Sequence, residues 1–143
     1  MTAYVLDASV AAKWVLPRAG ETLVEEAEVL LDLFARGKVG LSVPDLFWAE
    51  VGNVLWKAAR AGRMSEAAAR RSMDVLLGLG LPSVPVAGLA ADALAVAMAF
   101  ERTVYDALYV ALAVSTRRTL VTADERLAHA LAAHLPVRWL GSL

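Results

Sequence analysis

Two neighbouring stretches decide the fold: Val104-Tyr105-Asp106-Ala107-Leu108-Tyr109-Val110-Ala111-Leu112-Ala113-Val114 and, shortly after it, Thr119-Leu120-Val121-Thr122-Ala123-Asp124. Between Ala107 and Val114 the only polar side-chain group is the Tyr109 hydroxyl, which predicts a helix buried in the core without a solvent face. The β-branched run of the second stretch predicts a buried strand, followed directly by another helix. Each stretch carries one acid, Asp106 at the start of the helix and Asp124 just past the strand.

Acidic side chains at these positions are suited to holding a cation. The free N–H groups and the dipole of a helix N-terminus favour an ionised carboxylate, although Asp106 could equally act only as a helix cap. Ligands of open α/β sheets bind at the carboxyl ends of the strands, where Asp124 is expected. The same arrangement recurs at the start of the chain, where Tyr4-Val5-Leu6 leads into Asp7.

A further acid, Glu50, lies in the middle of a predicted helix. Glu50 shares one helical face with Asn53 and Lys57, so polar groups interrupt an otherwise apolar stripe. Either these groups form a network within the helix or Glu50 has a functional role, because a charge bordered by aromatic side chains is costly unless it is paired or binds a metal.

The remaining pattern alternates strands and helices, which predicts βα units and a mostly parallel sheet wrapped by helices in one domain, residues 1–143. Strands are expected at residues 3–6, 39–43, 83–86, 119–121 and 137–140. Helices are expected from about Ser9, at 22–35, from Pro44-Asp45 to Gly62, from Ser65-Glu66 to Gly78 or Gly80, at 89–100, after Thr103 and from Ala123.

Composition excludes several classes of protein. The absence of cysteine excludes disulfides, thiol nucleophiles and cysteine-ligated zinc. The net charge of −1 provides no global attraction for nucleic acid, and the local excess of basic residues between Lys57 and Arg71 is explained most simply as a solvated helix face.

No stretch resembles a signal peptide or reaches the ~20 apolar residues of a membrane span, so a cytoplasmic location is expected. A hydrophobic content of 59% in so short a chain predicts self-association or an apolar groove for a partner.

Together, Asp7, Glu50, Asp106 and Asp124 lie on different predicted elements and are expected to converge on one crevice. Such a cluster either shares protons or collects a hard divalent cation, and oxygen-only ligands favour magnesium or manganese. The chain has no well-placed histidine base. Metal-assisted hydrolysis of a phosphodiester is therefore the reaction class that best fits this set of residues.

Four segments, in order and spacing, resemble the motifs of the PIN-domain family, with the greatest similarity to its VapC toxin branch. They are Val5-Leu6-Asp7-Ala8-Ser9, the segment from Pro44 to Leu55 carrying Glu50 and Asn53, Tyr105-Asp106-Ala107-Leu108-Tyr109, and Leu120-Val121-Thr122-Ala123-Asp124. The resemblance implies a three-layer α/β fold with a central, mostly parallel sheet of four to five strands flanked by helices. It also implies an endoribonuclease dependent on Mg²⁺ or Mn²⁺, a homodimer, and a small cognate antitoxin of the VapB type.

By position, the resemblance makes Asp7, Glu50 and Asp106 metal-binding carboxylates and Asp124 a fourth acid that supports a metal, a water or the geometry of the cluster. Accessory roles are expected for three polar residues, each of which could instead serve only local hydrogen bonding: Ser9, Asn53 and Thr122.

Lys13 could meet a substrate phosphate or be merely solvated. Two other functions stay open. One is another metal-dependent phosphohydrolase, although a haloacid-dehalogenase-like enzyme would need an acid at Ser9. The other is a non-catalytic protein-binding module whose acidic pocket receives a basic partner.

Overall fold

The computed structural model describes residues 1–143, whose five strands form a single sheet in the order β3-β2-β1-β4-β5. Every neighbouring pair of strands is parallel. The strands are β1 Thr2–Leu6, β2 Val39–Pro44, β3 Ser83–Val84, β4 Thr119–Thr122 and β5 Val137–Trp139. The α-helices are α1 Ala8–Val15, α2 Val24–Ala35, α3 Leu46–Arg60, α4 Glu66–Leu77, α5 Ala90–Phe100, α6 Val104–Thr116 and α7 Glu125–Leu131. Two short 3₁₀ helices span Val86–Gly88 and Leu140–Ser142.

The predicted elements are confirmed, with boundaries that shift by a few residues. The third strand is shorter than expected because the chain turns into a 3₁₀ helix at Val86. The core helix α6 begins at the Thr103 cap, whose hydroxyl accepts a hydrogen bond from the Asp106 backbone N–H at 3.1 Å. Its residues from Ala107 to Ala113 are buried as predicted, but Val114 is 51% exposed, so the helix does have solvent contact in its last turn.

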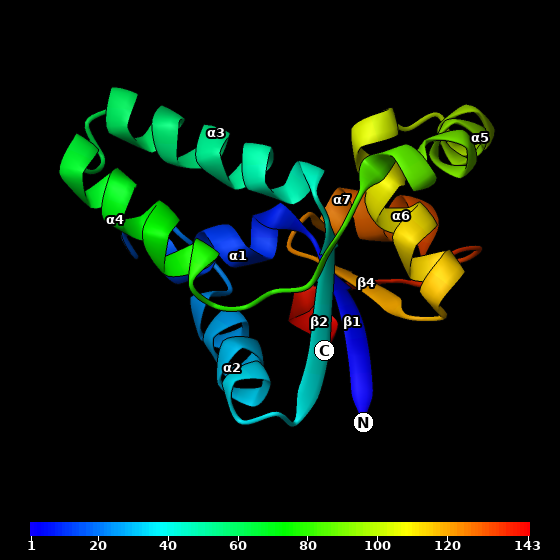
Figure 1. Ribbon diagram of the computed structural model, residues 1–143, viewed down its shortest axis with the longest axis horizontal. Helices are drawn as coiled ribbons and strands as arrows, with labels where there is room; N and C mark the ends of the chain where they lie inside the picture. Colours follow the sequence, from blue (N-terminus) through cyan, green and yellow to red (C-terminus); the bar gives the residue numbers. More distant parts are fainter.

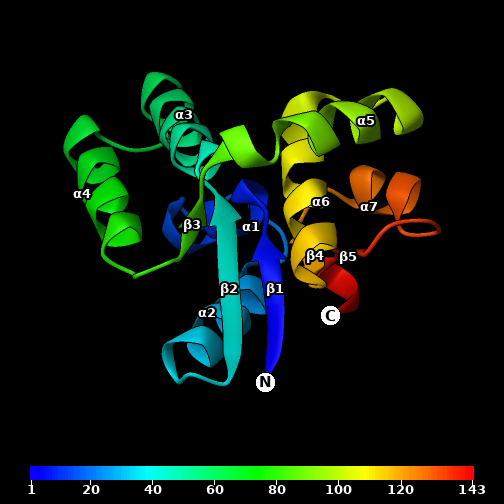
Figure 2. The same cartoon turned by 45° about the vertical axis from the view of Figure 1, so that its right-hand side comes forward.

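The sheet lies between two layers of helices (Figure 2), with α6 in front of the strands and with α1 and α2 behind them. Helix α5 packs on α6, which buries one side of each against the other. Helices α3 and α4 form a hairpin that projects sideways from the carboxyl end of β2 (Figure 1). None of the helices combines the length and apolar character needed to cross a membrane.

The strand order reverses direction at β1, which has β2 on one side and β4 on the other. The chain moves outward from β1 to β2 and β3, and later from β4 to β5, so the connections leave β1 and β4 in opposite directions. Such a switch point opens a crevice at the carboxyl ends of the two strands. Asp7 follows β1 directly, and its backbone N–H donates to the Val121 carbonyl of β4 at 3.0 Å, which joins the two strands at this position.

Candidate active site

A pocket of about 490 Å³ lies at the carboxyl ends of β1 and β4. All four predicted acids line it, together with the predicted accessory residues Ser9 and Asn53. Thr122 does not line the pocket but lies fully buried beneath it. The lining comes from α1, α3, α6, α7 and the strand ends: Asp7, Ala8, Ser9, Leu46, Ala49, Glu50, Asn53, Val54, Lys57, Tyr105, Asp106, Asp124 and Leu127.

Asp7 is held by two hydroxyl groups that donate to the same carboxylate oxygen. The Ser9 and Thr122 hydroxyls lie 2.6 and 2.8 Å from Asp7 Oδ2. The same hydroxyl oxygens accept backbone N–H groups, since Ala123 donates to Ser9 and Asp124 donates to Thr122. These contacts fix the orientation of Asp7 and tie the end of β4 to the start of α1.

Glu50 receives a hydrogen bond from a residue that was expected only to be part of the core. The Tyr109 hydroxyl donates to Glu50 Oε1 at 2.5 Å, across a sequence separation of 59 residues. Tyr109 is 2% exposed, so this hydrogen bond joins α6 to α3 inside the core. Sequence reasoning missed this partner, although Tyr109 is the only polar group in its apolar run and a buried phenol needs an acceptor.

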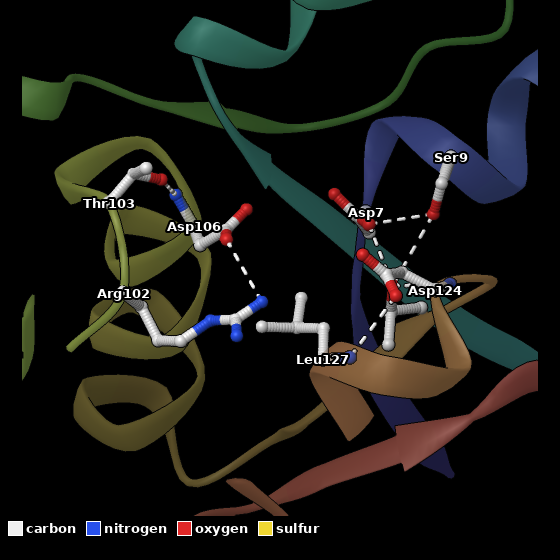
Figure 3. A network of polar contacts seen from close by, with 8 residues as sticks. Asp7, Ser9, Arg102, Thr103, Asp106, Asp124 and Leu127 are labelled. Carbon is white, nitrogen blue, oxygen red and sulfur yellow. Dashed lines mark hydrogen bonds and ion pairs between the residues drawn. The ribbon is translucent and has the colours of Figure 1, made fainter. Parts of the chain in front are cut away.

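Asp106 and Asp124 face the pocket from opposite sides (Figure 3). Asp106 enters from the first turn of α6, and its Oδ2 lies 3.7 Å from a guanidinium nitrogen of Arg102. Asp124 precedes α7, and its Oδ1 accepts the Leu127 backbone N–H at 3.1 Å, which caps that helix. Asp124 is thus both a capping residue and a pocket residue.

Burial, and to a lesser extent neighbouring charge, raises the pKa values of Asp7, Glu50 and Asp106. Burial raises the pKa of Asp7; hydrogen bonds from Ser9 and Thr122 oppose the rise, and the charge of Asp106 adds to it. Burial likewise raises the pKa of Glu50, opposed by the Tyr109 hydrogen bond and increased by the charges of Asp7 and Asp106. For Asp106, burial again raises the pKa, Arg102 opposes the rise, and Asp124 adds to it. The pocket therefore disfavours its own negative charge.

This donor set fits a hard divalent cation. Its side chains offer carboxylate oxygens, and a cation would offset both the cost of burying their charges and the repulsion between them. No three acids lie close enough together to coordinate a single ion directly. Magnesium usually keeps several of its waters and binds through only one or two carboxylates, so a pocket of this size suits a hydrated ion.

The two lysines near the acids have different surroundings. Lys57, on the same face of α3 as Glu50, lines the pocket. Lys13 does not reach it, because its ammonium group pairs with Glu21 at 3.2 Å. Neither expectation for Lys13 fits this structure, because its side chain is only 10% exposed and pairs with Glu21, and Lys57 is the lysine that lines the pocket.

Comparison with known proteins gives consistent results. The family model described as PIN domain matches residues 4–131. The chain is 35% identical over 130 residues to Ribonuclease VapC3 of Pyrobaculum aerophilum, which covers 87% of this chain and 91% of that protein. Its structure is similar to the crystal structure of PAE2754 from the same organism, with a TM-score of 0.70 and 28% identity over 99% of this chain and 92% of that one.

A toxin-antitoxin complex from Klebsiella pneumoniae contains a chain of the same fold. The TM-score is 0.60, and the match covers 94% of this chain and 95% of that one. At 16% identity this similarity concerns the fold alone.

Proposed function

The chain belongs to the PIN-domain family, and on that premise we propose that it is a metal-dependent endoribonuclease of the VapC type, the toxin of a toxin–antitoxin pair. The observation that carries the proposal is the convergence of Asp7, Glu50, Asp106 and Asp124 from separate elements on one pocket. The ribonuclease name of a relative that matches most of the chain supports RNA as the substrate class.

Asp7, Glu50 and Asp106 would hold a hydrated Mg²⁺ or Mn²⁺, one or two of them directly and the others through its waters, with Asp124 supporting those waters. When bound, such an ion polarises the scissile phosphate and activates the attacking water. The protein residues prepare this site. Ser9 and Thr122 orient Asp7, and Tyr109 orients Glu50. Asn53 makes no side-chain hydrogen bond within the chain and lines the pocket, where its amide can contact the substrate.

An antitoxin of the VapB type would silence the enzyme by covering an apolar groove and placing a basic side chain among the acids. The pocket supports this mode, because its four acids have a single ion pair between them, the 3.7 Å contact of Asp106 with Arg102. Both proteins would act in the cytoplasm, where RNA is made and translated. Coexpression with the cognate small protein should give a complex that does not cleave RNA.

A homodimer is the expected assembly. Several apolar side chains of α5 and α6 are exposed, including Leu94 at 47%, Met98 at 73% and Val114 at 51%. Exposed apolar groups gathered on two packed helices are typical of interfaces. Chromatography with light scattering tests this assembly, and a monomer at all concentrations would contradict it.

The nuclease proposal is tested by incubating a mixed pool of structured RNAs with the purified chain and manganese, with and without a chelator. Asp106→Asn serves as the inactive variant and Arg36→Gln as a surface control, because Arg36 pairs with Asp32 far from the pocket lining. We expect cleavage by the wild type and the control only, and only with metal. Cleavage that survives both the chelator and Asp106→Asn would contradict the proposal.

The same shortage of ion pairs among the pocket acids gives a second candidate some weight, namely a non-catalytic module whose acidic pocket receives a basic partner. Metal binding separates the two. A chain that binds a basic peptide in the pocket, binds no manganese and cleaves no RNA would be such a module.

A further inference from the structure

One tryptophan differs from the others in its exposure. Trp56 is 53% exposed, whereas Trp14, Trp48 and Trp139 are partly buried against the core. The guanidinium carbon of Arg60 lies 5.0 Å from the centre of the Trp56 ring, one helical turn further along α3. This pair offers an exposed aromatic face beside a cation, two groups that can contact a ligand together.

Arg60 lies further along α3 than the residues that line the pocket, and Trp56 directly precedes the last of them, Lys57. Along α3, Glu50, Asn53, Lys57 and Arg60 are spaced by three, four and three residues, which places them along one side of the helix. The first three line the carboxylate pocket. Lys57 lies ~10 Å and Arg60 ~15 Å from Glu50 along the helix axis.

A second hollow of about 280 Å³ continues from this stripe between α3 and α4, the two helices that project from the sheet in Figure 1. Its lining includes Trp56, Arg60 and Arg70, with Glu66 as its single acid. The basic residues of this part of the chain are exposed, as expected of a solvated face, and three of them also line a cavity: Lys57 the acidic pocket, and Arg60 and Arg70 the hollow that follows it.

We propose that this side of α3 binds the single-stranded part of an RNA next to the scissile phosphate, with Lys57 contacting a phosphate and Trp56 with Arg60 stacking an unpaired base. The inference rests on the proposed nuclease function and names the substrate feature that it uses. An acidic pocket repels the RNA backbone, so positive charge beside it is needed to bring a phosphate close. Aromatic rings and guanidinium planes stack unpaired bases whatever their sequence, whereas a paired base offers no free face.

The test measures binding rather than cleavage, so that it does not depend on catalysis. A labelled, random-sequence single-stranded RNA is titrated with chelator present into the wild type, Trp56→Leu, Trp56→Phe, Arg60→Gln and the control Arg36→Gln. Loss of one stacked base weakens binding by ~5–150-fold, and we expect a loss in this range for Trp56→Leu. Trp56→Phe should keep most of the affinity because it retains an aromatic face.

Two further readouts separate stacking from a structural role. RNA should quench the tryptophan fluorescence of the wild type, and Trp56→Phe should lose this quenching while still binding. Arg60→Gln should weaken binding, since the stacked base loses the guanidinium plane beside the Trp56 ring. Double-stranded RNA of the same length should compete poorly.

The proposal is overturned if Trp56→Leu binds RNA as tightly as Arg36→Gln does, or if the duplex competes as well as the single strand. It is also overturned if Trp56→Leu changes only the oligomeric state, because Trp56 would then belong to an interface between protein chains. A wild type that binds RNA through Trp56 but never cleaves it would retain this surface and contradict only the nuclease function.

Discussion

Carboxylates lie near both ends of helix α1, and the two ends differ in how the negative charge is balanced. Beyond its C-terminal end, Glu21 lies 3.2 Å from the Lys13 ammonium and 3.3 Å from the Arg63 guanidinium. At its N-terminal end, Asp7 lies in a pocket with three other acids, where the one ion pair is the 3.7 Å contact of Arg102 with Asp106.

The difference indicates which acids the fold uses for itself. Glu21 joins α1 to the end of α3 through cations of the same chain, and its charge needs no external partner. Burial raises the pKa values of three of the pocket acids, Asp7, Glu50 and Asp106, and the four acids have only one ion pair among them. Uncompensated charge in a cleft is typical of functional sites, whereas compensated charge is typical of structural ones.

The largest effect should come from removing one pocket acid. Asp106→Asn keeps the shape of the side chain and its place next to the helix cap but removes a ligand charge. Mutating a residue that only hydrogen-bonds to a metal ligand already lowers metal affinity or activity by ~10–100-fold. For the loss of a proposed ligand itself we expect kcat to fall by at least ~100-fold. Single-turnover cleavage with saturating manganese measures it, and circular dichroism confirms that the fold is intact.

Cleavage should also fall steeply in acid. The pKa values of Asp7, Glu50 and Asp106 are raised above their ordinary values of 3.8, 4.5 and 3.8. Their protonation, which prevents cation binding, therefore begins at a higher pH than for ordinary carboxylates. We expect the acid limb of the pH–rate profile to lie above the usual carboxylate range, and a limb centred at the ordinary values would contradict the burial argument.

Stability should move in the opposite direction across the same pH window. A carboxyl group with a raised pKa in the folded state binds more protons there than in the unfolded chain, so the free energy of unfolding decreases as the pH rises through the window. The metal-free protein should thus lose stability where it gains activity. Thermal unfolding at several pH values, with chelator, checks this trend.

Removing the Tyr109 hydroxyl tests whether the hydrogen bond from α6 orients Glu50 in the pocket. Tyr109→Phe removes the hydrogen bond to Glu50 and should lower activity by ~10-fold, because Glu50 loses its orienting partner. The pKa of Glu50 should rise further in this variant, since the lost hydrogen bond opposes the effect of burial on that pKa. The acid limb of the pH–rate profile should accordingly shift to higher pH in this variant, a shift that a purely structural role for Tyr109 would not produce.

Glu21→Gln is the opposite case and should affect stability alone. It leaves Lys13, whose side chain is 10% exposed, without its carboxylate. Breaking a buried pair costs ~3–5 kcal/mol, and partial exposure of Arg63 and Glu21 reduces this to an expected ~1–3 kcal/mol. Urea unfolding measures the loss, while kcat of the folded variant should equal that of the wild type.

Most of the fold was predictable from local patterns. The apolar run of α6, the β-branched strands and the helix caps determine where elements begin and end, and the family inferred from four short motifs is confirmed by the match over residues 4–131. The approach of Asp7 and Asp124 followed from a general rule, since the carboxyl ends of parallel strands meet at one edge of the sheet. Glu50 and Asp106 lie on helices, which this rule does not position.

Contacts across the fold could not be predicted in the same way. Lys13 and Lys57 both follow a candidate site residue by a few positions in a helix, and the sequence does not say which one turns toward the crevice. Glu21, in the loop after α1, decides the matter by pairing with Lys13. The link between Tyr109 and Glu50 likewise depends on how α6 lies against α3, a relation that no local pattern encodes.

The most direct test of the central claim is calorimetric titration of Mn²⁺ into the metal-free wild type, Glu21→Gln and Asp106→Asn. If the uncompensated acids form the cation site, the wild type and Glu21→Gln bind with the same affinity, and Asp106→Asn loses most of it. Equal binding by all three, or no binding by the wild type, would contradict the assignment of the pocket as a metal site.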